Sequence, residues 1–222
     1  MKDTNISSLM GDHLDEVTDA IINGKYNEIE GLVKAAIDDN VKLDAIINDA
    51  MIAAMDVVGK KFSDSEIFVP EMLVSAVTMK KGLELIKPLL KGDELESKGT
   101  IVMCTVLGDI HDIGKNLVIM MLQGAGFHCV NLGVNIPADK LIQEVKEIKP
   151  DIIGISALLT TSMPHITKVT EGLKANGLRN SVKVMVGGAP VDATFAEKIG
   201  ADGYGKDAAE AVSLARRFVS EK

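Results

Sequence analysis

Five short apolar runs alternate with helical patterns over the second half of the sequence, and this alternation restricts the fold more than any other feature. The apolar runs are rich in β-branched residues, and each is followed by a helical pattern. Alternation of this kind predicts a parallel β-sheet covered by helices on both faces. The predicted strands are 100–106, 127–132, 151–156, 182–186 and a weak fifth at 201–203, and the predicted helices are 114–123, 138–148, 163–175, 192–199 and 208–219.

The first part of the chain, residues 8–90, shows helical periodicity and no strand signal. The expected helices are 12–22, 26–37, 43–58 and 70–86, of which 43–58 is the most apolar and the last has Pro70 in its first turn. Four helices with short connections predict a small bundle. Residues 88–99 have the composition of a linker. We therefore predict an α/β protein with an N-terminal four-helix bundle cap (1–91) and a C-terminal domain (92–222) with a flavodoxin-like or Rossmann-like five-stranded parallel sheet.

The charge and composition of the chain exclude several classes of partner. The net charge is −8, and residues 1–92 carry 10 Lys and Arg against 16 Asp and Glu. Aromatic residues make up only 3% of the sequence, so neither a basic footprint nor stacking platforms for nucleic acid are expected. The N-terminus has no apolar signal region and no stretch is long enough to cross a membrane, so we expect a cytoplasmic protein. Cys104 and Cys129 lack CxxC spacing, and we expect both to be reduced core residues.

A histidine lies between two aspartates in the loop that follows the first predicted strand. The loop runs from Gly108 to Gly114 and contains Asp109, His111 and Asp112. Such loops lie at the carboxyl edge of a parallel sheet, where α/β proteins bind ligands. A histidine there is free to bind a metal, and Asp109 can orient it by accepting its other ring N–H. With the strand order 2-1-3-4-5, the loops 107–113 and 157–162 would flank one crevice.

Other sites are not supported by the residues themselves. The loop matches neither the glycine pattern of dinucleotide-binding proteins nor that of a P-loop. The remaining histidines, His13, His128 and His165, do not have zinc-ligand spacing, and we interpret His128 and His165 as structural.

Three motifs together resemble a known fingerprint. Asp109-x-His111-x-x-Gly114 is followed after 41 residues by Ser156-x-Leu158, and after another 28 by Gly187-Gly188. This order and spacing resemble the cobalamin-binding domain of methionine synthase and of the corrinoid proteins of methyl transfer. The helical part, with its joint at 66–73, is similar to the free-standing corrinoid proteins of methanogens and acetogens. The resemblance implies that the cofactor is cobalamin or a related corrinoid.

The resemblance also implies a role for individual residues. His111 would ligate cobalt from below in place of the cofactor's benzimidazole, Asp109 would hydrogen-bond the far ring nitrogen, and Ser162 would hydrogen-bond Asp109. Glycines would leave room for the displaced nucleotide tail, hydroxyls would bind it, and Asp112 has no firm role beyond capping a helix. Packing alone explains Leu158 about as well as cofactor binding does. The further cofactor-binding residues implied are Gly108, Ile110, Asp112, Gly114, Ser156, Leu158, Thr160, Gly187, Gly188, Tyr204, Gly205 and Ala208.

The connection between the third and fourth predicted helices is unusually apolar for a loop. It contains Phe62, Ile67, Phe68 and Val69. These residues either close the core of the bundle or belong to a lid over the cofactor. By analogy with the family, the residues of such a lid would be Met55, Val69, Met72 and Leu73.

The resemblance implies a cofactor-carrying subunit of an enzyme system. A substrate-specific methyltransferase would load the cobalt with a methyl group from methanol, a methylamine or a methoxylated compound. A second methyltransferase would deliver the methyl group to coenzyme M or tetrahydrofolate, and a reductive activation protein is a third candidate partner. Two alternatives are the cobalamin-binding subunit of a mutase, which lacks the four helices, and a cobalamin-dependent sensor, which carries a basic DNA-binding segment for which residues 1–7 leave no room.

Overall fold

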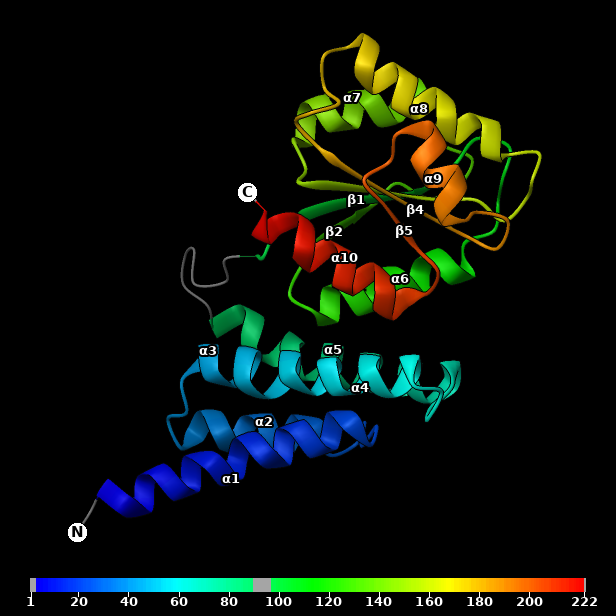
Figure 1. Ribbon diagram of the computed structural model, residues 1–222. Helices are drawn as coiled ribbons and strands as arrows, with labels where there is room; N and C mark the ends of the chain where they lie inside the picture. The colour runs from blue at the N-terminus through cyan, green and yellow to red at the C-terminus, as the bar shows by residue number, and fades with distance from the viewer. Residues whose placement is uncertain (1–2, 90–96, 222) are drawn as a thin grey trace. The chain divides into compact units, whose positions relative to one another are not determined.

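The computed structural model describes residues 3–89 and 97–221, and the chain divides into two compact units, Met1–Glu96 and Ser97–Lys222 (Figure 1). The boundary expected at 91/92 lies outside the described residues. Among the described residues, no helix is both long and apolar enough to cross a membrane.

The first unit is helical, as predicted. Its core is aliphatic and includes Ile29, Val33, Ile46 and Met51, which are all buried. Two helices are longer than predicted, since the first begins at Asp3 and the third runs past Gly59 to Ser63. The third helix contains a π-helical stretch. Within this stretch, the carbonyl of Ala50 accepts a hydrogen bond from the hydroxyl of Thr18 (3.4 Å). The elements are α1 (Asp3–Ile22), α2 (Ile29–Asp38), α3 (Leu43–Ala45), η1 (Ile46–Ile52), α4 (Ala53–Ser63), α5 (Val69–Ile86) and η2 (Lys87–Leu89).

The second unit is the predicted parallel sheet with alternating helices. Its strands lie in the order β2-β1-β3-β4-β5 and every pairing is parallel, which confirms the flavodoxin-like order. The elements are β1 (Thr100–Thr105), α6 (Ile113–Gly124), β2 (His128–Asn131), α7 (Ala138–Ile148), β3 (Ile152–Ser156), α8 (Met163–Ala175), β4 (Lys183–Gly187), α9 (Ala193–Ile199), β5 (Gly203–Gly205) and α10 (Ala208–Ser220).

The fifth strand begins two residues later than the predicted 201–203 because Asp202 is occupied elsewhere. Its carboxylate accepts hydrogen bonds from the Val184 amide (2.7 Å) and from Arg179 (2.8 Å). Arg179 also donates to the Gly200 carbonyl. These contacts hold Asp202 and Gly200 beside the start of β4, and the paired residues of β5 begin at Gly203.

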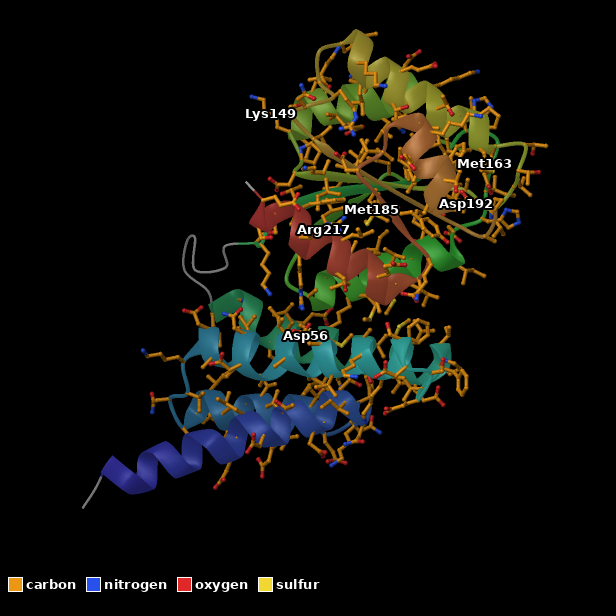
Figure 2. The ribbon with its side chains drawn as sticks, viewed as in Figure 1. Asp56, Lys149, Met163, Met185, Asp192 and Arg217 are labelled. Carbon is orange, nitrogen blue, oxygen red and sulfur yellow. The ribbon has the colours of Figure 1, made fainter. Side chains whose placement is uncertain are left out.

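Helices cover both faces of the sheet. In Figure 1, α7, α8 and α9 lie on one face and α6 and α10 on the other. The core beneath the first group includes Val102, Ile153, Val184 and Leu173. Figure 2 labels Asp192 at the start of α9, where its side chain caps the helix by accepting from the Phe195 amide (2.7 Å).

The register of the strands brings the carboxyl ends of four of them into one row. Thr105 of β1 pairs with Ser156 of β3, Ser156 pairs with Gly187 of β4, and Gly187 pairs with Gly205 of β5. Residues far apart in the sequence therefore meet at one edge of the sheet. The loops that leave this edge carry most of the residues that the sequence singles out.

Candidate functional site

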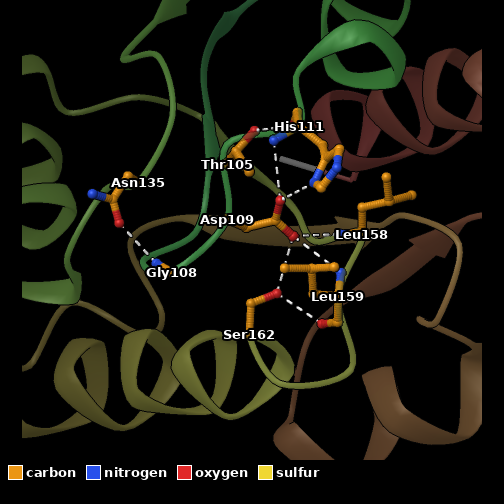
Figure 3. A network of polar contacts seen from close by, with 8 residues as sticks. All are labelled: Thr105, Gly108, Asp109, His111, Asn135, Leu158, Leu159 and Ser162. Carbon is orange, nitrogen blue, oxygen red and sulfur yellow. Dashed lines mark hydrogen bonds and ion pairs between the residues drawn. The ribbon is translucent and has the colours of Figure 1, made fainter.

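The carboxylate of Asp109 is the centre of a network of polar contacts at this edge (Figure 3). It is completely buried. Its Oδ1 accepts from the backbone N–H (3.0 Å) and from Nδ1 (2.7 Å) of His111. Its Oδ2 accepts from the amides of Leu158 (2.6 Å) and Leu159 (3.1 Å) and from the hydroxyl of Ser162 (3.1 Å). Every lone-pair direction of the carboxylate is thereby used.

These hydrogen bonds keep Asp109 ionised despite its burial. Burial by itself raises the pKa of the carboxyl group, since it disfavours the charged form. The hydrogen bonds from the His111 and Leu158 amides, the His111 ring and the Leu159 amide outweigh it and hold the pKa well below the ordinary range. Asp109 is therefore a fixed negative charge that can only accept hydrogen bonds.

This fixed charge determines which nitrogen of His111 carries the proton. Because ionised Asp109 can only accept, Nδ1 must carry a proton, and in the neutral ring Nε2 therefore keeps its lone pair. The side chain of His111 is 49% exposed, and among the described residues Nε2 has no hydrogen-bond partner. His111 therefore presents an oriented electron-pair donor to any ligand at the sheet edge.

The surroundings of His111 fit a metal that arrives in a macrocycle. Over residues 3–89 and 97–221, no group of three or more His, Cys, Asp or Glu side chains is arranged to hold a metal ion. A metal already bound in the plane of a macrocycle needs only one axial protein ligand, as in haem proteins. Apolar side chains are also exposed beside His111, as the wide face of such a ring requires. They are Ile110 (73% exposed), Ile113 (79%), Leu158 and Leu159.

The structure brings Asp109, His111 and Ser162 together, as the resemblance implied, and it adds a contact that the sequence did not reveal. The prediction left open whether Leu158 binds the cofactor or only packs in the protein. Leu158 is 44% exposed, and its backbone N–H donates to Asp109. A backbone donor leaves no trace in the sequence, so neither Leu158 nor Leu159 could be recognised in this role.

The two adjacent glycines have a structural reason of their own. Gly188 has a φ of 117°, and a Cβ added there would overlap the carbonyl oxygen of Ala157. At Gly187 a Cβ would lie 2.9 Å from the Gly205 carbonyl oxygen. Neighbouring backbone thus already requires glycine at both positions. Around Gly114, in contrast, a Cβ would meet no atom within 4 Å.

Asp112 occupies the N-cap position of α6, but its side chain does not cap the helix. Its carboxylate instead accepts from the side-chain amide of Asn116 (2.9 Å). Beside this pair, Lys115 is only 2% exposed. The Lys115 ammonium donates to the side-chain oxygens of Asn116 (2.7 Å) and Asn131 (2.9 Å). A buried lysine was not predicted, because in sequence Lys115 looks like an ordinary helix surface residue.

Removal of Lys115 is expected to show a pH-dependent effect on stability. Burial lowers the pKa of its ammonium, while the charge of Asp112 and the Cys104 thiol oppose this shift. Below the folded-state pKa the folded and unfolded chains both hold the proton, so the penalty of burying the charge is fully present. It shrinks as the pH rises through the folded-state pKa and vanishes above the unfolded value of about 10.4.

The test is to measure the free energy of unfolding of wild type and Lys115→Met between pH 7 and 10. The difference between them should shift in favour of the wild type as the pH rises. Groups that the two proteins share cancel in this comparison. A difference that does not change with pH would show that folding leaves the pKa of Lys115 unchanged.

The other predicted residues are distributed along the same edge or lie in the first unit. Ser156 ends β3, Thr160 is exposed in the following loop, Tyr204 lies in β5, and Ala208 is the buried first residue of α10. Both cysteines are free thiols; Cys104 lies in the core as expected, whereas Cys129 is only half-buried, and burial raises the pKa of each to about 12.

In the first unit, the apolar joint between α4 and α5 divides into two parts. Phe62 and Ile67 are half-buried, whereas Phe68 is 66% exposed and Val69 is also exposed. The bundle core therefore accounts for the first pair better than for the second. Two of the predicted lid residues, Met55 and Met72, are buried.

A parallel sheet with one carboxylate-oriented imidazole at the switch point between β1 and β3 defines a cofactor-binding α/β protein. Comparison with protein families makes this class specific. Residues 99–213 and residues 13–87 match two family models, both described as a B12 binding domain. The chain therefore belongs to the B12-binding family, and its cofactor is cobalamin or a related corrinoid.

Close relatives narrow the family to corrinoid proteins. The chain is 41% identical over 211 residues to a corrinoid protein of Desulfitobacterium hafniense, covering 94% of this chain and 98% of the relative. It is also 41% identical over 208 residues to the dimethylamine corrinoid protein of Methanosarcina barkeri, covering 93% and 97%. Among solved structures, the methanol:cobalamin methyltransferase complex of Methanosarcina barkeri matches with a TM-score of 0.85 and 30% identity, over all of this chain and 82% of the matched one.

Proposed function

We propose that this chain carries methyl groups, on the cobalt of a bound corrinoid, between two methyltransferases. The observation that carries the proposal is the imidazole of His111, whose Nδ1 is bound to Asp109 and whose Nε2 is left for a metal. The similarity to dimethylamine and trimethylamine corrinoid proteins supports it. The corrinoid, when bound, supplies the cobalt atom that takes up and releases the methyl group.

The site residues have separate tasks in this proposal. His111 binds cobalt through Nε2, Asp109 holds the ring and its proton at Nδ1, and Ser162 helps to hold Asp109. Ile110, Leu158 and their apolar neighbours exclude water from the lower face of the corrinoid. We also propose that the nucleotide tail passes Gly114 and the hydroxyls of Ser156 and Thr160 along the carboxyl edge of the sheet, and that Gly108, Gly187, Gly188, Tyr204 and Ala208 line its path.

We propose further that the first unit covers the upper face of the corrinoid. Of the predicted lid residues, Val69 is exposed and Leu73 is half-buried, so these two offer apolar surface for that purpose. Met72 and Met55 would contribute only by supporting them from beneath.

The partners that we propose are methyltransferases. A structural relative comes from a complex with a methyltransferase. We propose a substrate-specific methyltransferase as the donor and a second methyltransferase, using coenzyme M or tetrahydrofolate, as the acceptor. A reductive activation protein would restore cobalt after accidental oxidation.

Reconstitution tests the function directly. The purified chain, loaded with a cobamide, is expected to be coloured and to show the absorption spectrum of a histidine-ligated corrinoid. The reduced form is then mixed with methyltransferases for methanol, each methylamine and methoxyarenes, and methylation is followed by the change in absorption. One of these enzymes should methylate the wild type. Corrinoid binding without methylation by any of them would contradict the methyl-carrier proposal.

A further inference from the structure

All backbone and ring groups of His111 that face the protein are held by two buried side chains. Asp109 accepts from its N–H and its Nδ1. The third group, the carbonyl, accepts a hydrogen bond from the hydroxyl of Thr105 at 2.9 Å (Figure 3). Thr105, like Asp109, is completely buried. Its hydroxyl is not among the groups that the proposed function uses.

Thr105 is itself placed by rigid structure. It is the last residue of β1 and pairs with Ser156 of β3. Its backbone N–H donates to the Gly133 carbonyl (3.0 Å), and its carbonyl accepts from the Ile136 amide (3.0 Å). The hydroxyl is therefore attached to the central part of the sheet, and a group that is hydrogen-bonded to it is held in a fixed position relative to the sheet.

The start of the loop is held through Asn135, whose side-chain oxygen accepts from the Gly108 amide (2.8 Å) and whose backbone N–H donates to the Asp109 carbonyl (2.9 Å). His111 lies beyond these contacts. Ile110 and Ile113, on either side of it, are mostly exposed, so apolar packing does not fix the loop there. The planar peptide group means that holding the carbonyl and the N–H of His111 fixes the direction of its Cα–Cβ bond. The contact from Nδ1 to Asp109 then restricts the ring. Among the described residues, Thr105 is the donor to the His111 carbonyl, so loss of its hydroxyl would leave this carbonyl without a hydrogen bond.

We infer that Thr105 is a positioning residue for His111, which holds its carbonyl so that Nε2 points at the metal. This inference rests on the proposed role of His111 as the axial ligand. It identifies a second restraint, separate from Asp109, that acts through the backbone rather than through the ring. Loss of the hydroxyl should leave the corrinoid bound but should lower the fraction of molecules in which His111 ligates the metal.

The test uses three variants made with ¹⁵N-labelled histidine and loaded with cob(II)alamin. In the electron paramagnetic resonance spectrum, ligation of cobalt by His111 gives ¹⁵N splitting (the nitrogen coupling measured here), whereas ligation by the cofactor's own benzimidazole gives ¹⁴N splitting. Thr105→Val keeps the shape of the side chain and removes the donor, and Thr105→Ser keeps the donor. The matched control is Thr170→Val, since Thr170 is also buried and donates to a backbone carbonyl (Thr167, 2.9 Å), but within α8.

The ratio of histidine-ligated to unligated protein should fall about tenfold in Thr105→Val, as expected for a buried carbonyl left without its donor. It should stay near the wild-type value in Thr105→Ser and Thr170→Val. In the apoprotein, hydrogen exchange at the His111 amide should also be faster in Thr105→Val alone. If Thr105→Val does not fold, Thr105→Ala, which adds no bulk, should show the same loss.

The outcomes separate this inference from the proposed function. Wild-type protein without nitrogen coupling would refute the ligand role of His111 itself. Nitrogen coupling in the wild type that persists unchanged in Thr105→Val would overturn the inference and leave the ligand role intact. An equal loss in Thr105→Ser or in Thr170→Val would overturn it too, because the hydroxyl of Thr105 would then not be the cause.

Discussion

Asp109→Asn is expected to prevent ligation of cobalt by His111 while the fold survives with reduced stability. An amide has one accepting oxygen where the carboxylate has two. If that oxygen faces the Leu158 and Leu159 amides, the NH₂ group faces His111. The ring can satisfy this arrangement only by accepting at Nδ1, which moves its proton to Nε2, the atom that should bind cobalt.

The opposite orientation of the amide is less favourable. It would keep the contacts with His111 but leave two buried backbone donors, Leu158 and Leu159, facing an NH₂ group. The first orientation leaves only the His111 N–H without an acceptor, because the ring adapts by changing its tautomer. With one buried donor unsatisfied and the charge assistance lost, the free energy of unfolding should fall by about 2–3 kcal/mol.

Denaturant unfolding of the apoprotein and the nitrogen coupling of the cob(II)alamin-loaded protein measure the two effects. Ser162→Ala is the matched control, since it removes a single donor at 3.1 Å and leaves the other four to Asp109 in place. It should cost less than about 1 kcal/mol and should retain the nitrogen coupling. If Asp109→Asn keeps its nitrogen coupling, the tautomer argument is wrong.

The fold was largely predictable because its signals are local. Each strand is an apolar run between turn residues, and the parallel alternation with helices leaves few possible topologies. The errors occur where a tertiary contact decides a boundary. Asp202 delays β5 by bonding to Arg179, and the π-helical stretch around Ala50 is invisible to a pattern that assumes 3.6 residues per turn.

The site was predictable in so far as it consists of unusual side chains. A histidine and an aspartate in one loop attract notice, and the spacing to Ser156 and Gly187 identifies the family fingerprint. Thr105 did not attract notice, because a β-branched residue at the end of a strand needs no further explanation. Lys115 was missed for a different reason, since its burial depends on Asn131, which lies on another element.

The glycines of the site should separate into two kinds when each is replaced by alanine. At Gly188 the backbone is left-handed and a Cβ would overlap the Ala157 carbonyl, so Gly188→Ala should destabilise the protein by about 3–5 kcal/mol even without cofactor. At Gly114, inside α6 and with open space around it, alanine should be neutral or stabilise the helix by up to about 1 kcal/mol. Thermal or denaturant unfolding of the two apoproteins measures the difference.

Corrinoid binding then shows whether Gly114 is needed for the nucleotide tail. If the tail passes Gly114, the alanine variant should bind cobalamin more weakly while folding as well as the wild type, because only the ligand meets the added methyl group. Cobinamide, which lacks the tail, should bind to both proteins equally. Equal cobalamin binding by wild type and Gly114→Ala would exclude a tail path beside this residue.

A fully stable Gly188→Ala would show that the close approach to Ala157 is not what requires glycine there. Only the affinity for a tailed corrinoid, measured where stability is unchanged, separates a glycine that makes room for a ligand from one that the chain's own backbone requires.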